Sequence, residues 1–148
     1  MTAFVPTEPA PTDHLVDAGY WRLHGTTHWH VWAAEIGTTD RDRYDAERLR
    51  RLDARARAVT DPREVLAWVV EQRLDALRQA PDAAAAARRA GWATPEAWRE
   101  RTEVTWELIT GASLAPAGGG VAISDGRSVD IFAVPMTARD CSRHSRRA

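Results

Sequence analysis

The chain of 148 residues contains one cysteine, Cys141, and neither lysine nor asparagine. A single cysteine cannot form a disulfide within the chain, which excludes a disulfide-stapled secreted scaffold and favours a reducing intracellular setting. No apolar run approaches the ~18 residues of a membrane span, and the N-terminal residues lack the basic start and apolar core of a signal peptide. We therefore expect a cytoplasmic protein that has no membrane partner.

The net charge is also small, because 20 basic residues, all of them arginine, stand against 21 acidic residues. This balance removes the whole-molecule attraction on which a nucleic-acid coat or a membrane-surface protein depends. Arginine at every basic position is typical of a GC-rich coding sequence. An arginine cluster is therefore weaker evidence for phosphate or carboxylate recognition here than in an average protein.

Composition along the chain predicts a lead-in, one domain and a tail. Residues 1–14 hold three prolines among small polar residues, which predicts a disordered lead-in. Residues 15–135 have the length and the hydrophobic content of a single α+β domain. Residues 136–148 are rich in arginine and predict a flexible basic tail.

The expected fold is two antiparallel β-hairpins around a layer of about four helices that is central in the sequence. Asp125-Gly126 between β-branched runs is typical of a type I′ hairpin turn, and β-rich residues also flank Gly25-Thr26. Because isolated hairpins are marginally stable, we expect both to join one sheet. Capping residues, first-turn prolines and helical periodicity predict the helices. The elements are hairpins at 20–36 and 121–134 and helices at 39–59, 62–80, 83–90 and 95–110.

The second of these helices is apolar around more than half of its circumference, so it is predicted to be the central buried helix. A substitution there that leaves a cavity should strongly destabilise the domain. Its expected core residues are Leu66, Val69, Val70, Leu74 and Leu77.

His28 and His30 form the most specific chemical motif in the chain. Residues two apart on a strand project from the same face, so both imidazoles can reach one metal ion. Strand alternation places Glu35 on the opposite face, and a third ligand therefore requires a kink or a residue from another segment. The alternative is that both histidines are neutral polar residues of a half-buried strand.

The stretch from Gly25 to Gly37 resembles the first metal motif of the cupins, in which two histidines one residue apart are followed after four residues by a glutamate. Cupins are β-barrels. The resemblance implies that His28, His30 and Glu35 are ligands of Zn²⁺ or Fe²⁺. The predicted C-terminal hairpin contains no histidine that could supply the second cupin motif.

Residues 85–99 look like the helix-turn-helix of repressor-type DNA-binding domains, with Ala87 four residues before Gly91 and Trp92 after it. The helix that would enter the major groove has a net negative charge, which a duplex repels. DNA is therefore a disfavoured partner, and an ordinary pair of packed helices is the alternative. The charged residues are Glu96, Glu100, Glu103 and Glu107 against Arg99 and Arg101.

The sequence contains no complete catalytic set. Cys141 lies in the predicted tail, where no rigid base can be fixed beside it, and Gly118-Gly119-Gly120 lacks the Lys and Thr of a phosphate-binding loop. This favours a non-enzymatic binding or regulatory protein without a cofactor. Seven tryptophans favour contacts with a protein partner or a second copy of the chain. The alternatives are a metal-binding protein or metal-dependent enzyme that uses His28 and His30, and a DNA-binding regulator.

Overall fold

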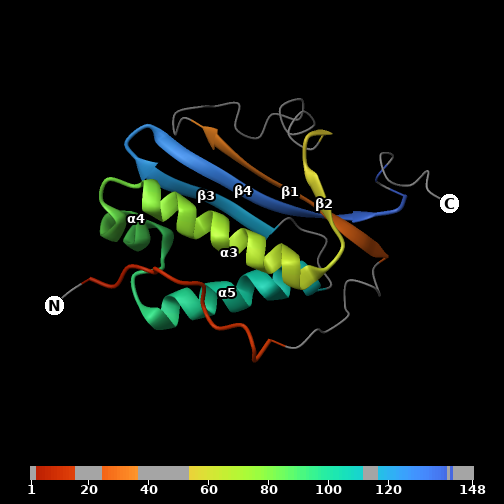
Figure 1. The fold of residues 1–148 in the computed structure, drawn as a ribbon, viewed down its shortest axis with the longest axis horizontal. Coiled ribbons are helices and arrows are strands. Elements are labelled where there is room, and N and C mark those ends of the chain that lie inside the picture. Colours follow the sequence, from red (N-terminus) through yellow and green to blue (C-terminus); the bar gives the residue numbers. More distant parts are fainter. Residues whose placement is uncertain (1–2, 16–24, 37–53, 112–116, 140, 142–148) are drawn as a thin grey trace.

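The computed structural model describes residues 3–15, 25–36, 54–111, 117–139 and 141. Four strands form one antiparallel sheet in the order β2-β1-β4-β3, and the helices cover one face of it, with α3 across the sheet and α4 beside β3 (Figure 1). This confirms the α+β class. The elements are β1 (Thr26–Ile36), β2 (Arg57–Val59), α3 (Pro62–Gln79), α4 (Ala83–Ala90), α5 (Pro95–Thr110), β3 (Ala117–Ser124) and β4 (Arg127–Thr137).

The N-terminal half of the fold differs from the prediction. The described residues contain three of the four predicted helices. Of the helix predicted over 39–59, Ala54 is helical and 57–59 is instead strand β2, which pairs with β1. Asp61, which precedes Pro62, is extended, as the steric demands of proline require, so this segment does not lead into α3 as one continuous helix. Residues 37–53 and the first strand of the hairpin predicted over 20–36 lie outside the described residues.

The C-terminal hairpin is confirmed, and its strands are longer than predicted. Its turn is not of type I′, because that type requires positive φ at both central residues and only Gly126, with φ of 79°, has it. β3 and β4 flank the Asp125-Gly126 turn, and β4 also pairs with β1 from Thr26 with Thr137 to Ile36 with Ser128. The predicted C-terminal hairpin and the N-terminal strand therefore lie in one sheet. The glycine run at 118–120, which precedes the predicted hairpin over 121–134, is part of β3.

The helices begin at the residues that the sequence marks as caps. The side chains of Asp61, Asp82 and Thr94 each accept a hydrogen bond from a backbone N–H of the first turn. Gly91 ends α4 in the left-handed region, with φ of 79°. None of the helices in the described ranges is long and apolar enough to cross a membrane.

The core lies between the helices and one face of the sheet. All five residues predicted for the central helix are buried in it. Strand alternation turns Trp29 and Val31 of β1 toward this core, and therefore turns His28 and His30 toward the other face. The sheet thus separates the helical layer from the side on which the two histidines lie.

The described part of the predicted lead-in packs on the helical layer (Figure 1). Ala10 is buried, and the indole N–H of Trp98 donates a hydrogen bond of 3.1 Å to the carbonyl oxygen of Glu8. At the other end, β4 continues to Thr137 and Cys141 is buried, so the first residues of the predicted tail belong to the folded domain. Residues 140 and 142–148 lie outside the described residues.

Candidate metal centre

The two histidines of β1 meet on the sheet face that is turned away from the helices. The Nε2 atoms of His28 and His30 are 3.1 Å apart, and the two ring centroids are 5.0 Å apart. His28 is 6% exposed and His30 is 1% exposed. Both imidazoles therefore share one face, as the spacing of two residues predicts, and both are removed from solvent.

Cys141 joins this pair from the end of the chain. Beyond β4, the backbone N–H of Cys141 donates to the carbonyl oxygen of Thr137 at 3.2 Å, which folds the chain back toward β1. The sulfur lies 3.3 Å from His30 Nε2, and Cys141 is 2% exposed. The three ligand atoms of His28, His30 and Cys141 lie within 4.8 Å of one another.

Glu35, the third ligand implied by the cupin resemblance, is not part of this cluster. Its Oε1 accepts a hydrogen bond of 2.7 Å from Arg127 Nε, and both side chains are about half exposed. This hydrogen bond is the main cause of the lowered pKa of Glu35. The carboxylate is therefore held in a surface ion pair away from the histidines.

The separations within the cluster are close to the edges of a tetrahedral metal site. With bonds of about 2.05 Å to nitrogen and 2.3 Å to sulfur, a tetrahedral Zn²⁺ holds two nitrogens about 3.3 Å apart and a nitrogen about 3.6 Å from a sulfur. The observed distances are 3.1 Å between the histidine nitrogens and 3.3 Å between His30 and Cys141. The third separation, between His28 and Cys141, is within 4.8 Å, so a shift of the Cys141 side chain toward His28 would complete a coordinating set.

Thr27 orients the first of these ligands. Its Oγ1 lies 2.8 Å from Nδ1 of His28. When Nδ1–H donates to this hydroxyl, the lone pair of Nε2 faces His30, which is the tautomer that a ligating Nε2 requires. Metal-bound histidines regularly have such a hydrogen bond at the second ring nitrogen, where it fixes the ring orientation.

Met136 is a further sulfur-containing residue on this face. It pairs with His28 across β1 and β4, and directly paired residues of antiparallel strands project from the same face. Its thioether is a soft donor of the kind that Cu⁺ prefers. The register therefore brings a fourth candidate donor to the side of the sheet that holds the cluster.

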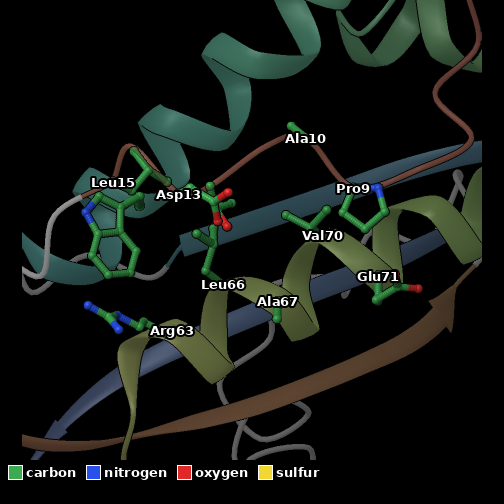
Figure 2. A pocket seen from close by; sticks show the side chains of 11 residues that line it. Pro9, Ala10, Asp13, Leu15, Arg63, Leu66, Ala67, Val70 and Glu71 are labelled. Atoms are coloured by element: carbon green, nitrogen blue, oxygen red, sulfur yellow. The ribbon is translucent and has the colours of Figure 1, made fainter.

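A separate cavity of about 370 Å³ lies between the N-terminal segment and α3 (Figure 2). Leu66, Ala67 and Val70 contribute apolar surface to it, and Arg63 and Glu71 are among its charged lining residues. Among the described residues, the lining contains no histidine or cysteine, and the cavity lies on the helical side of the sheet. It is therefore independent of the histidine cluster.

The predicted pair of helices around Gly91 is formed by α4 and α5. Trp92 and Trp98 pack edge to face with ring centroids 5.2 Å apart, and both are buried beside Ala87. The exposed face of α5 carries Glu96, Glu100 and Glu107 next to Arg99 and Arg101. The motif thus packs as two helices of the core layer, and its exposed face has no excess of positive charge.

No family model matches the chain, and neither a curated protein nor a solved structure matches it. The class of this protein is therefore defined by its fold and by the cluster of His28, His30 and Cys141. The protein is a small α+β domain in which one antiparallel sheet carries helices on one face and a candidate His₂Cys metal centre on the other.

Proposed function

We propose that the protein binds one closed-shell transition-metal ion, Zn²⁺ or Cu⁺, at His28, His30 and Cys141. The observation that carries this proposal is the convergence of three buried donor groups, one of them 111 residues away from its nearest partner in the sequence. Imidazole and thiolate are the donors that these ions prefer. The proposal retains the histidine pair of the sequence prediction and replaces Glu35 with Cys141.

A metal explains the paired histidines better than a nucleophilic thiol does. The contact between Cys141 and His30 alone is compatible with a thiol and its general base. However, a nucleophile must be reached by its substrate, and Cys141 is almost fully buried. The second histidine has no role in such a dyad. A cation between the rings would accept the lone pairs of both Nε2 atoms. Without a cation, the two Nε2 atoms, which are 3.1 Å apart, have to share one proton.

The ion would connect β1 to the residue that follows β4. Because the ligands come together only in the folded chain, the free energy of metal binding adds to the free energy of folding. Three protein ligands leave one tetrahedral position, and Met136 is the donor that the strand register brings to this face. With Met136 bound, the set is softer than that of an ordinary structural zinc site and favours Cu⁺.

The first test is the metal content of untagged protein after exposure to Zn²⁺ or Cu⁺ and exhaustive dialysis. We expect about one metal ion per chain for the wild type and none for His30→Ala. His14→Ala is the matched control, because His14 is half exposed and lies against Glu103 instead. Wild-type protein that retains neither ion, or retention by His30→Ala equal to that of the wild type, would contradict the proposal.

The burial of the tryptophans weakens the hypothesis of a protein partner. Trp29, Trp32, Trp92, Trp98 and Trp106 are buried, and Trp68 is partly buried against the core. The tryptophans of the described residues therefore stabilise the domain and do not form an exposed platform. Association through protein contacts stays a prediction, and the sequence argument based on tryptophan no longer favours it over metal binding.

A further inference from the structure

A cluster of three arginines lies on the helical side of the sheet, opposite the metal centre. Arg73 of α3, Arg89 in the last turn of α4, and Arg101 of α5 line a cavity of about 210 Å³. The other described residues of the lining are Ala90, Trp92, Gly118, Gly119, Gly120 and Val121, and none of them is acidic. In the part of the chain that the structure describes, no ion pair involves any of the three arginines.

Arg73 is the unusual member of this cluster. It is only 6% exposed, and its Nη1 is buried without a hydrogen-bond partner. Its guanidinium lies 5.7 Å from the ring centroid of Trp92, whose indole N–H is also buried without a partner. Burial, together with the positive charge of Arg101, lowers the pKa of Arg73 to about 10. Buried donors without acceptors are costly and rare, so these two groups are available to bind an acceptor.

The glycine run of β3 provides the space for such an acceptor. Burial alternates along β3, so position 119 faces the helices between the buried residues Ala117 and Val121. A Cβ atom at Gly119 would meet no atom within 4 Å, and the φ of 149° excludes most side chains. At Gly118, a Cβ atom would collide with the carbonyl oxygen of Ile131. The backbone therefore leaves open a space that a core side chain would otherwise fill.

We propose that this cavity binds a small oxyanion, the phosphate group of a phosphorylated small molecule or free phosphate, through Arg73, Arg89 and Arg101. Guanidinium groups donate paired hydrogen bonds to phosphate oxygens, and three positive charges in a lining whose described residues include no acid match a doubly charged anion. The frequent use of arginine in this chain accounts for exposed arginines. It does not account for one that is buried without a partner.

The size and depth of the cavity define the ligand further. About 210 Å³ holds a phosphate group with a small substituent. Because Arg73 is almost fully buried, the phosphate backbone of a nucleic-acid duplex cannot reach it, which favours a small molecule. The two possible sources of the phosphate differ only in the substituent, so binding measurements with both can distinguish them.

The test is calorimetric titration of the full chain with inorganic phosphate and with glycerol 3-phosphate, with succinate and chloride as reference anions. We expect saturable binding of a phosphate species, weakened at least ~10-fold in Arg101→Gln and in Arg89→Gln, because each substitution removes charge-assisted hydrogen bonds. Tighter binding of glycerol 3-phosphate would identify a phosphorylated small molecule, and equal affinity would identify phosphate itself.

Arg99→Gln is the matched control, since Arg99 is exposed on α5 outside this cavity. We expect this variant to bind as the wild type does. Arg73→Met should also lose binding. If Arg73→Met does not fold, the variants Arg89→Gln and Arg101→Gln still test the proposal. Absence of saturable phosphate binding, or equal weakening by Arg99→Gln and Arg101→Gln, would overturn the proposal.

Discussion

Replacement of Arg73 by methionine should stabilise the protein in the absence of phosphate. The pKa of Arg73, lowered from the usual arginine value to about 10 mainly by burial, indicates that the folded state disfavours the charged guanidinium. A shift of this size corresponds to roughly 3 kcal/mol. Because the folded-state pKa lies below the unfolded one, the penalty is fully present at any pH below about 10 and is relieved only above it. At neutral pH the substitution therefore removes the whole penalty.

Part of this gain is offset by the lost contact with Trp92. A cation over an indole ring contributes about 1–2 kcal/mol when it is desolvated, whereas methionine retains the packing of the aliphatic stem. We therefore expect Arg73→Met to raise the free energy of unfolding by about 1–2 kcal/mol. A buried charge that costs stability is typical of a residue retained for binding.

The assay is urea unfolding followed by tryptophan fluorescence at neutral pH in a buffer without phosphate. Saturating phosphate should then stabilise the wild type and leave Arg73→Met unchanged, which reduces the difference between them. A decrease in the free energy of unfolding of more than ~1 kcal/mol for Arg73→Met in the phosphate-free buffer would refute the reasoning, since it would show that Arg73 contributes net stability without a ligand.

Three further predictions concern the core and the metal centre. Leu74→Ala should lower the free energy of unfolding by ~2–5 kcal/mol, because Leu74 is 1% exposed in the core; a change below ~0.5 kcal/mol would place α3 at the periphery. Thr27→Val should weaken metal affinity ~10–100-fold by removing the acceptor for His28 Nδ1–H, as measured by competition with a chelator; unchanged affinity would exclude this orienting role. Glu35→Gln should leave metal content unchanged. The ion pair with Arg127 stabilises the folded protein above the unfolded pKa of Glu35, near 4.5, and this stability is lost as the pH falls through the lowered folded pKa. Glu35→Gln should abolish this contribution, so acid titration of the stability of both proteins checks the pairing.

Local signals predicted the helices and the C-terminal hairpin because these elements depend on residues close in the sequence. Asp61, Asp82 and Thr94 satisfy backbone donors within one turn, and Gly126 supplies the positive φ of the hairpin turn. The pairing of β1 with β4 connects residues about a hundred positions apart, and no local pattern specifies it. The role of β2 depends on the same long-range arrangement.

Cys141 was missed because Pro135 suggests the end of a strand. In the structure, Pro135 lies in β4 opposite Trp29, beyond Ala133, the last residue of β4 that pairs with β3. A proline is tolerated there because only one neighbouring strand requires hydrogen bonds. β4 therefore continues past the proline to Thr137 and delivers Cys141 to the histidines. The alternation of apolar residues from Val129 onward was the available signal for this extension.

The central claim is that one metal ion is bound by a thiolate and two imidazoles, and titration with Co²⁺ tests it most directly. Co²⁺ replaces Zn²⁺ in tetrahedral sites and reports a thiolate ligand by charge-transfer absorption in the near ultraviolet. Because the chain has one cysteine, any such band comes from Cys141. We expect the band to saturate at one equivalent in the wild type and to be absent in Cys141→Ser. A titration without this band, or one in which Cys141→Ser binds Co²⁺ as tightly as the wild type, would contradict the account.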